Sequence, residues 1–420
     1  MTGPGTDTHR AIDAVWRIES PKIVAALTRM TRDVGVAEDL AQDALVAALE
    51  QWPGEGIPRN PGAWLMAAAK HRAIDFFRRG RMAGDKHAEI GRDLHAEQNR
   101  TPDFDSALDD DVGDDLLRLM FIACHPVLSL EARVALTLRL LGGLTTQEIA
   151  RAFLVPEPTI AQRIVRAKRT LSKEDVPFEV PHGADLDVRL SSVLGVIYLI
   201  FNEGYTATAG DDWTRPSLCE EALRLGRVLA ELAPQEAEVH GLVALMEIQA
   251  SRLRARVDGA GQPILLLDQN RALWDRLLIQ RGLAAIARAE RLGTPRGPYL
   301  LQASIAACHA RALEAKATDW HRIVSLYDEL ARTAPSPIVD LNRAVAVGMA
   351  SGAQAGLDTL DRLRDEPALR NYHLLPSVRA DLLEKLGRRD EARAEFERAA
   401  SLTRNARERE LLLARARRQT

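Results

Sequence analysis

Apolar residues recur at intervals of three and four positions along most of the chain, and clusters of proline and glycine interrupt them. This spacing places the apolar side chains on one face of an α-helix, whereas a β-strand alternates with a period of two. The pattern therefore predicts an all-α protein. Helical blocks are expected over residues 8–81, with an interruption at 52–58, then over about 114–171, and from about 185 to the end.

The stretch at residues 82–113 lacks this helical pattern and is rich in acidic groups. Clustered like charges with few apolar residues are typical of a solvated chain, so we predict a flexible acidic linker. Four parts are then expected: a first domain at 8–81, the linker at 82–113, a second domain at 114–175 and a helical extension at 185–420.

The composition agrees with this division. A chain of 420 residues exceeds an ordinary single domain, and 46% hydrophobic against 5% aromatic residues favours a soluble helical protein. No signal-peptide pattern begins the chain and no apolar run reaches the ~20 residues that span a bilayer, so a cytoplasmic protein is expected. The chain has three widely spaced cysteines, Cys124, Cys219 and Cys308, which suits reduced thiols in the core. No metal or cofactor is expected.

Charge is distributed unevenly along the chain. The formal net charge of −3 says nothing about nucleic acid by itself, but residues 59–86 and 151–173 form two basic segments. The second of these segments coincides with the most specific motif of the chain.

Residues 144–169 predict a helix-turn-helix. Thr145 and Glu148 have the spacing of a capping box, in which each side chain accepts a hydrogen bond from the other residue's backbone N–H. The first helix then packs inward through Ile149, Ala150 and Phe153. After a short turn, the second helix buries a further three residues: Ile160, Ile164 and Ala167.

The other faces of this second helix carry polar and basic groups: Thr159, Gln162, Arg163, Arg166, Lys168 and Arg169. A helix-turn-helix places such a helix in the major groove, where its first residues reach base edges. Gln162 and Arg163 suit that role, whereas the later basic groups suit phosphates, which add affinity without sequence preference. A solvated basic helix within a bundle is the plainer alternative for this segment alone.

The first block carries two further candidate surfaces. Asp39, Gln42 and Asp43 fall on one helical face, where carboxylates could dock on basic groups of a protein partner, with a merely solvated face as the alternative. The helix at residues 63–79 bears a polar stripe and three aromatic residues, Trp64, Phe76 and Phe77. Basic and aromatic groups together suit melted, single-stranded DNA, although Trp64 fits a core position better than a stacking platform.

Taken together, these blocks resemble the extracytoplasmic-function (ECF) group of the sigma-70 family of RNA polymerase sigma factors, in which a region 2 domain and a region 4 domain are joined by a linker. Residues 37–49 are similar to region 2.2, residues 63–79 to regions 2.3 and 2.4, and residues 114–171 to region 4. The resemblance implies binding to core RNA polymerase, through its clamp helices and flap, and to promoter DNA. It also implies that the linker threads toward the RNA exit channel.

The resemblance assigns roles residue by residue. Contacts to the polymerase clamp helices fall on Asp39, Gln42 and Asp43. Contacts near the minus-10 element fall on Lys70, His71, Arg72, Asp75, Arg78 and Arg79. Contacts to the minus-35 element fall on Thr159, Gln162, Arg163 and Arg166, with Lys168 and Arg169 on neighbouring phosphates.

Some positions depart from the family pattern, and others indicate one subset of the family. Leu154 stands where a helix-turn-helix often has a turn glycine, and Pro156 replaces the usual Ser or Thr cap of the second helix. Residues 153–157 and 198–205 are similar to stretches in one subset of the family that carries a long C-terminal extension resembling tetratricopeptide (TPR) repeats.

The extension itself shows weak internal repetition. Residues 231–234 and 329–335 end two helices with the same chemistry, Glu-Leu-Ala followed by proline. Residues 371–403 have the packing positions of one TPR unit, with Gly387 at the turn between its helices: Ala380, Leu383, Ala392, Phe396 and Ala399. Stacked helical hairpins of this kind bury their faces against their neighbours and form large binding surfaces, so the extension is expected to regulate the sigma domains or bind a regulatory protein.

The expected function is thus that of an ECF-type sigma factor that directs promoter-specific transcription initiation and has no catalysis of its own. The main alternative is a TPR scaffold with a helix-turn-helix that regulates transcription without joining polymerase. An enzyme built around Glu203 and Asp211 has little support, because no nucleophile and base, phosphate loop or metal spacing accompanies these acids. The stretch before Tyr205 instead predicts a buried helix that ends at Gly204 in a left-handed cap.

Overall fold

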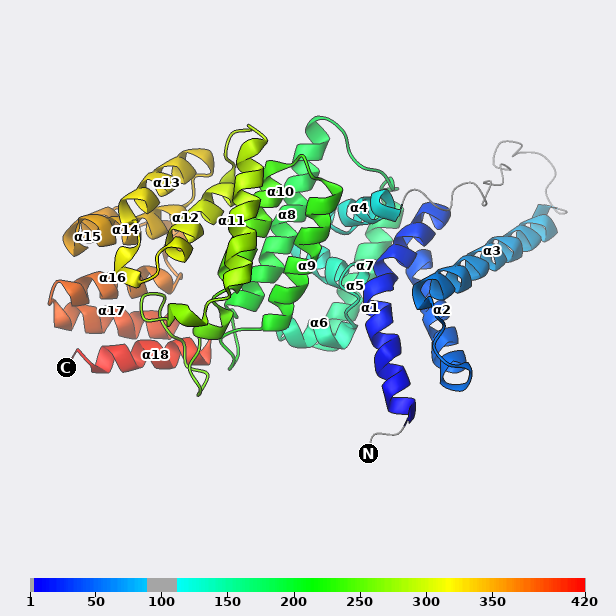
Figure 1. Cartoon of the computed structure of the whole chain (residues 1–420), viewed down its shortest axis with the longest axis horizontal. Helices are drawn as coiled ribbons and strands as arrows, with labels where there is room; N and C mark the ends of the chain where they lie inside the picture. Colours follow the sequence, from blue (N-terminus) through cyan, green and yellow to red (C-terminus); the bar gives the residue numbers. More distant parts are fainter. Residues whose placement is uncertain (1–3, 89–111, 420) are drawn as a thin grey trace. The chain divides into compact units, whose positions relative to one another are not determined.

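The computed structural model describes residues 4–88 and 112–419, and over these ranges it consists of α-helices and short 3-10 turns without a β-strand (Figure 1). The prediction of an all-α protein is confirmed. The chain divides into two compact units, Met1–Val196 and Ile197–Thr420, and the boundary falls inside one helix.

The first unit contains α1 (Pro4–Thr31), α2 (Val34–Glu55), α3 (Pro61–Ala88), α4 (Val112–Ala123), α5 (Leu130–Leu140), α6 (Thr146–Phe153), α7 (Glu157–Lys173) and the start of α8 (Ala184–Tyr205). The second unit continues with α9 (Pro216–Leu232), α10 (Ala237–Ala250), α11 (Arg276–Arg291), α12 (Pro298–Arg311), α13 (Trp320–Thr333), α14 (Pro337–Ser351), α15 (Ala353–Asp361), α16 (Leu374–Lys385), α17 (Arg389–Leu402) and α18 (Ala406–Arg417).

Helices α1, α2 and α3 pack together around buried apolar side chains that include Leu27, Trp52 and Leu65. Helix α2 begins after Asp33, whose carboxylate accepts hydrogen bonds from two backbone N–H groups of the first turn. Helix α3 continues through residues 82–88, which the sequence pattern assigned to the linker, because no proline stops the helix there. The rest of the predicted linker, up to residue 111, lies outside the described residues.

Helices α4 to α7 form the second half of this unit, and α6 and α7 make the predicted helix-turn-helix. The expected inward face of α7 is confirmed, since Ile160, Ile164 and Ala167 are buried. In α6, Ile149 and Ala150 are buried, but Phe153 is only half-buried because it lies in the last turn, next to the connection to α7.

The first turns of α8 are held against α4 and α5 by polar contacts. Arg133 donates to the hydroxyl of Ser192 at 2.6 Å, and that hydroxyl donates to the carbonyl oxygen of Cys124 at 2.6 Å. Arg189 donates to the carbonyl oxygen of Phe121 at 3.0 Å. These bonds satisfy carbonyl groups at the C-terminal end of α4, which a helix leaves without partners.

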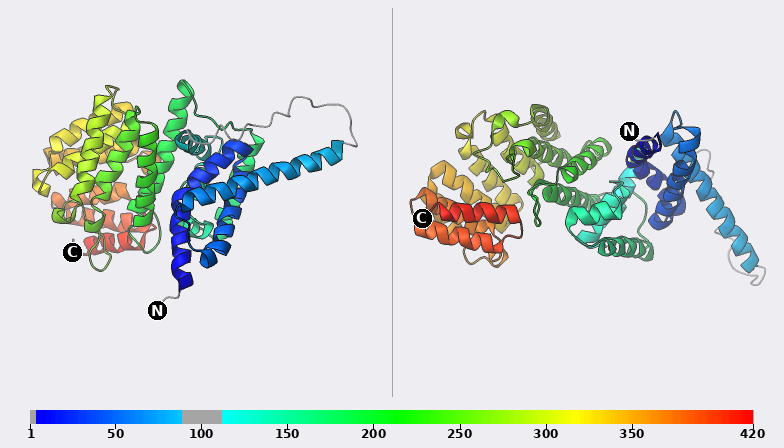
Figure 2. Two further views of the ribbon diagram at one scale, coloured as in Figure 1. Left: turned by 45° about the vertical axis from the view of Figure 1, so that its right-hand side comes forward. Right: turned by 90° about the horizontal axis from the view of Figure 1, so that it is seen from below.

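In the second unit, helices adjacent in the chain pack on one another, and Figure 2 shows them stacked in chain order from α9 to α18. Three apolar cores follow in series: the first joins α10, α11 and α12, the second joins α12, α13 and α14, and the third joins α14 to α18. Each core is shared between neighbouring helices, which is how stacked helical hairpins gain stability.

The beginning and the end of the second unit meet at Asn405. This buried side chain donates to the carbonyl oxygens of Ala207 at 3.1 Å and Asp212 at 2.9 Å, both in the loop after α8. Its own carbonyl oxygen accepts from Arg407 and Glu408 N–H groups and so caps α18. One side chain therefore both begins the last helix and ties it to the first loop of the unit.

Local expectations for the extension are met where they can be checked. The five packing positions predicted for residues 371–403 are all buried in α16 and α17, and Gly387 between these helices has the positive φ of 74° that a glycine turn allows. The two Glu-Leu-Ala segments end α9 and α13 in the same way, with Ala233 N–H donating to Leu229 and Ala334 N–H to Leu330, each at 2.8 Å.

Gly204 differs from its predicted role. Helix α8 passes through it to Tyr205, and its φ is not positive, so there is no left-handed cap. A Cβ atom at this position would lie 2.7 Å from the backbone nitrogen of Cys219. Glycine is needed here because α9 approaches the backbone of α8 closely.

Candidate DNA and polymerase interfaces

The predicted polymerase-binding face lies on the middle of α2. Asp39 and Asp43, one turn apart, are exposed, as the sequence predicts. Gln42 is half-buried, and its amide donates to the carboxylate of Glu38 at 2.8 Å. The two aspartates therefore share an open surface, while Gln42 turns toward the buried Glu38.

The predicted minus-10 residues lie along α3. His71, Asp75, Arg78 and Arg79 are exposed. The two remaining members are half-buried: Lys70 and Arg72. Arg78 pairs with Asp75 at 3.2 Å, so the charges of this stripe interact along their own helix.

The aromatic residues of this helix divide into two groups. Trp64 is half-buried, and its ring meets the edge of the buried Trp52 with centroids 5.4 Å apart, which identifies it as a core residue. Phe76 is exposed beside the half-buried Phe77, with ring centroids 5.7 Å apart. Phe76 and Phe77 are thus the aromatic surface that lies next to the basic stripe.

The helix-turn-helix begins with the predicted capping box. Thr145 accepts from the N–H of Glu148 at 3.1 Å, and Glu148 accepts from the N–H of Thr145 at 2.8 Å. Burial alone would raise the pKa of the Glu148 carboxyl, but these hydrogen bonds and the charge of Arg17 hold that pKa below its usual value. The carboxylate of Glu148 also forms an ion pair with Arg17 of α1.

The turn between α6 and α7 is made without glycine. Leu154 adopts a left-handed conformation with φ 51° and ψ 40°, and its side chain is 55% exposed. Pro156 makes no side-chain cap to α7, and Pro158 fits the first helical turn because its missing N–H would have no helical partner there. The family departures noted in the sequence are therefore accommodated by backbone geometry.

The predicted minus-35 residues do not share one environment. Gln162, Arg166 and Arg169 are exposed on α7. Thr159 and Arg163 are half-buried. Lys168 differs from all of these, because its side chain is only 18% exposed and its ammonium group forms an ion pair with Glu38 of α2.

Glu38 is the site residue that the sequence pattern missed. It is 5% exposed and accepts a hydrogen bond from the guanidinium of Arg139, in α5, at 2.6 Å, in addition to its ion pair with Lys168. Burial alone would raise the pKa of this carboxyl, but the two cations outweigh burial and lower the pKa. We call Glu38, Arg139 and Lys168 the Glu38 cluster.

One further ion pair, besides that of Arg17 with Glu148, connects α1 with the second half of this unit. Arg29 lies 3.3 Å from the buried Asp115 of α4, which also pairs with Arg118 at 2.8 Å. Gly143, just before α6, has φ 63°, and a Cβ atom there would lie 3.3 Å from the Cα atom of Arg17. The backbones approach closely at this point.

In the second unit, Glu203 and Asp211, the two candidate acids of the sequence, lie in different environments. Glu203 is buried and forms an ion pair with Arg215, and it accepts from the Thr208 hydroxyl at 2.9 Å. Asp211 is exposed. Glu203 therefore fixes the loop that follows α8.

Tyr205 instead joins an alternating series of aromatic rings and arginines. The guanidinium of Arg256 lies 3.7 Å from the centre of the Tyr205 ring, and that of Arg252 lies 5.7 Å from both Tyr205 and Trp274. Arg271 lies 4.8 Å from Trp274. Burial lowers the pKa of Arg252 and Arg271, and the aromatic faces offset part of that cost.

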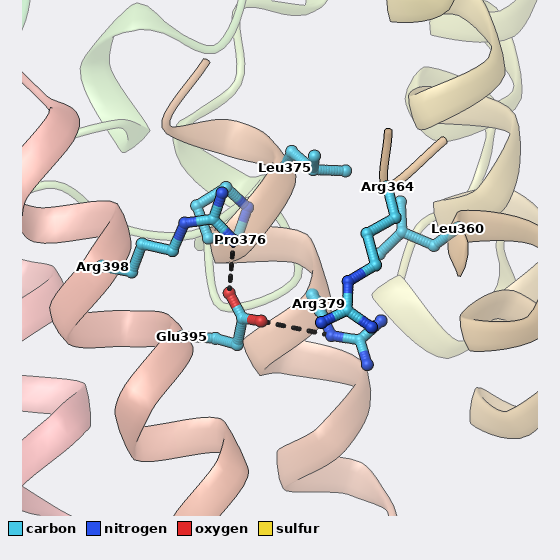
Figure 3. A pocket seen from close by; sticks show the side chains of 7 residues that line it. All are labelled: Leu360, Arg364, Leu375, Pro376, Arg379, Glu395 and Arg398. Carbon is cyan, nitrogen blue, oxygen red and sulfur yellow. Dashed lines mark ion pairs between the residues drawn. The ribbon is translucent and has the colours of Figure 1, made fainter. Parts of the chain in front are cut away.

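A small pocket of the second unit is lined mainly by charged groups and lies beside α15, α16 and α17 (Figure 3). Glu395 projects into it and pairs with Arg379 at 3.3 Å and Arg398 at 3.8 Å. Arg379 also pairs with Asp361. Most of these charges compensate one another, as in a salt-bridge network that joins neighbouring hairpins.

The three cysteines are core residues. All three cysteines are buried and unbridged, and burial raises the pKa of the Cys124 thiol to about 11 and of the Cys219 thiol to about 12. Among the described residues, no three His, Cys, Asp or Glu side chains are grouped so as to hold a metal ion. In the same part of the chain, no helix combines the length and apolar character needed to cross a membrane.

Three protein families match parts of the chain. Sigma-70 region 2 matches residues 16–82, and Sigma-70 region 4 matches residues 118–171. A family of unknown function, DUF6596, matches residues 189–290, from α8 into α11. The first two matches cover the helices that carry the candidate interfaces.

Two relatives illustrate the extent of the similarity. The chain is 43% identical over 390 residues to the uncharacterized protein R00370 of Rhizobium meliloti (strain 1021), which covers 92% of this chain and 91% of that protein. It is 27% identical over 172 residues to the "Probable ECF RNA polymerase sigma factor SigI" of Mycobacterium tuberculosis (strain ATCC 25618 / H37Rv), covering 41% of this chain and 58% of that protein. No solved structure matches the chain.

A regulator that carried only a helix-turn-helix would account for the region 4 match but not for region 2. Both regions are present, in the order that sigma factors have, and an ECF sigma factor is among the relatives. These regions imply binding to core RNA polymerase and promoter DNA. The chain is therefore a member of the sigma-70 family of the ECF type, a transcription initiation factor rather than an enzyme, with an additional C-terminal helical domain.

Proposed function

We propose that the exposed face of α2 binds the clamp helices of core RNA polymerase through Asp39, Gln42 and Asp43. The observation that supports this assignment most directly is the exposure of Asp39 and Asp43 one turn apart on a helix whose opposite face is buried. Two carboxylates on a rigid helix suit a basic partner surface, because opposite charges steer association and fix the docking register.

The DNA contacts in this proposal are divided between two helices. Helix α3 meets the melted minus-10 element with His71, Arg78, Arg79 and the neighbouring Lys70, Arg72 and Asp75, while Phe76 and Phe77 offer rings on which bases stack. Helix α7 meets the minus-35 element, with Gln162 and Arg163 at base edges and the other predicted residues of that helix at phosphates. Region 4 also contacts the polymerase flap.

The proposal further assigns regulation to the C-terminal domain, residues 185–420, as TPR-like hairpins that bind a regulatory protein. Its support is the series of three shared cores and the hairpin of α16 and α17, whose packing positions follow the TPR pattern. Stacked hairpins present extended surfaces suited to a protein partner.

Charge reversal on α2 tests the polymerase contact. We expect the full chain with Asp39→Arg and Asp43→Arg to lose at least about tenfold in affinity for core polymerase, because like charges then oppose the partner's basic groups. Glu50→Arg, at an exposed position further along α2, is the matched control and should bind normally. Unchanged binding of the double variant, measured by fluorescence anisotropy with labelled chain, would remove the polymerase assignment.

Run-off transcription with core polymerase on a promoter library tests the whole assignment and supplies the promoter sequence. Comparison of the full chain with a chain that ends at residue 196, whose helical content is checked by circular dichroism, then tests the C-terminal domain. We expect altered promoter-specific transcription without that domain. Equal transcription by both chains, with and without cell extract, would show that the domain has no regulatory role.

A further inference from the structure

The Glu38 cluster connects the two functional halves of the first unit. Glu38 belongs to α2, directly before Asp39 of the proposed polymerase face. Lys168 belongs to α7, among the proposed minus-35 residues, and Arg139 belongs to α5. A buried carboxylate of region 2 thus binds two cations of region 4.

The contact is built rather than incidental. Gln42 and Arg139 both donate to one carboxylate oxygen of Glu38, at 2.8 Å and 2.6 Å, and Lys168 forms an ion pair with the other oxygen. Side chains of three helices therefore contact this carboxylate. Two separate ion pairs, between Arg17 and Glu148 and between Arg29 and Asp115, join the same two regions elsewhere. A carboxylate that is 5% exposed requires such partners, because an unpaired buried charge is strongly destabilising.

The chemistry of this contact allows exchange. A lysine bound to a carboxylate can bind a phosphate instead, because both groups offer anionic oxygen acceptors. Buried ion pairs also add little net stability compared with apolar packing, because desolvation offsets much of their attraction. A small cleft lies against the cluster, so the packing there is incomplete: its lining is Trp16, Ser20, Val24, Glu38, Gln42, Arg139, Leu140 and Gly143.

We propose that the Glu38 cluster is an autoinhibitory contact: Glu38 holds region 4 against region 2 and occupies Lys168, and promoter phosphates replace Glu38 when the two regions separate. This inference rests on the proposed function, because it assumes that Lys168 meets DNA. In the closed state Lys168 is 18% exposed, while Arg166 and Arg169 of the same helix remain exposed. Region 4 can therefore meet DNA first through its outer arginines and then open.

The contact is tested without polymerase or DNA by the distance between the two regions. Fluorophores are placed on cysteines introduced in the full chain at Val46 of α2 and at Val127, between α4 and α5, because both positions are exposed. Burial raises the pKa of the Cys124 and Cys219 thiols and of the Cys308 thiol, which keeps these native groups unreactive.

We expect Glu38→Gln to increase the open fraction about tenfold, a common size for coupling between two sites, and so to lower the energy transfer. Glu50→Gln is the matched control and should transfer like the unmodified chain. The exchange Glu38→Lys with Lys168→Glu restores one ion pair and should raise the transfer again. If Glu38→Gln does not fold, Lys168→Met breaks the same ion pair and keeps the apolar stem of the side chain.

Equal transfer in Glu38→Gln, Lys168→Met and the unmodified chain would overturn the proposal. Run-off transcription at limiting core polymerase tests whether the Glu38 cluster inhibits transcription. In that case Glu38→Gln should raise transcription about tenfold. If Glu38→Gln separates the two regions but transcribes less than the unmodified chain, the proposal is also overturned. The absence of transcription by every variant, together with the expected distances, would instead count against the proposed function alone.

Discussion

Two basic helices of this sigma factor have similar compositions and different surroundings. In α3, Arg78 pairs with Asp75 of the same helix, and Arg72 and Arg79 donate to carbonyl oxygens one turn earlier. In α7, Lys168 reaches a carboxylate of another domain and is withdrawn from solvent. The basic groups of region 2 are therefore presented within one helix, whereas part of the region 4 surface depends on how the two regions are packed.

The difference teaches that basic side chains on one helix are not equally available to a ligand. An exposed arginine would bind a phosphate at the cost of its hydration, whereas Lys168 would first have to lose its ion pair with Glu38. Under the proposed function, the DNA affinity of region 4 would then include the free energy of separating the two regions, as for any site that is only partly competent.

The largest effect on stability is expected from core substitutions that destabilise the region around one of these helices and leave the other region intact. Ile160→Ala in α7 and Leu65→Ala in α3 each remove a buried side chain and should cost about 3 kcal/mol. Hydrogen exchange should show Ile160→Ala loosening α6 and α7, with loss of minus-35 duplex binding, and Leu65→Ala loosening α1 to α3. Val165→Ala, at an exposed position beside Ile164, is the control and should change little. If either variant increases hydrogen exchange equally in both regions, the two regions do not unfold independently.

A smaller effect should come from the phosphate contacts themselves. Removing two contacts lowers the slope of log affinity against log salt concentration by about 1.8 on duplex DNA and about 1.4 on single strands. We expect the first value for Arg166→Gln with Arg169→Gln on a minus-35 duplex, and the second for Arg78→Gln with Arg79→Gln on a minus-10 single strand.

Two single substitutions complete this salt series. Lys316→Gln, at an exposed lysine of the C-terminal domain, should leave both slopes unchanged. Lys168→Gln should change the slope by less than one whole phosphate contact does, because Glu38 competes with the phosphate. If Lys168→Gln instead lowers the slope as much as the removal of a whole phosphate contact, the Glu38 cluster does not restrict this side chain.

Local features of both helices could be predicted from the sequence. The capping box of Thr145 and Glu148 and the buried face of α7 depend on spacings of three and four residues, and a helix realises such spacings wherever it lies. The same holds for the hairpin of α16 and α17 with its glycine turn. These contacts join residues close in the chain, so the sequence pattern contains them.

The features that the sequence did not predict are contacts between distant segments. Glu38 and Arg139 are 101 positions apart, and nothing in the pattern of α2 distinguishes Glu38 from its exposed neighbour Asp39. Gly204 is required by the approach of α9 rather than by a local turn. The ion pair between Glu203 and Arg215 likewise depends on the loop after α8, which must fold back before the two charges meet.

The N-cap residues of α2 and α6 allow a third comparison of the two regions, because removal of either cap should cost about 1 kcal/mol of local stability. Thr145→Ala removes a hydroxyl that accepts the N–H of Glu148 at the start of α6, and Asp33→Ala removes a carboxylate that accepts two N–H groups at the start of α2. Each substitution should lower local stability by about 1 kcal/mol, measured by hydrogen exchange in the first turn of the helix. Thr145→Ser and Asp33→Asn keep a hydrogen-bond acceptor at the cap and should retain most of the local stability. Caps that prove neutral would mean that tertiary packing alone sets where these helices begin.

The smallest effect concerns the turns that precede α2 and α7. Arg32, before α2, and Leu154, before α7, both have positive φ, 54° and 51°, which costs an L-residue roughly 1 kcal/mol. Because glycine avoids this cost but loses more entropy on folding, Arg32→Gly and Leu154→Gly should each stabilise their region by roughly 0.5 kcal/mol in hydrogen exchange. Gly387→Ala, at φ 74° between α16 and α17, should have the opposite sign. If only Leu154→Gly destabilises, the half-exposed leucine contributes packing that outweighs its strained backbone, and the helix-turn-helix depends on tertiary contacts even at its turn.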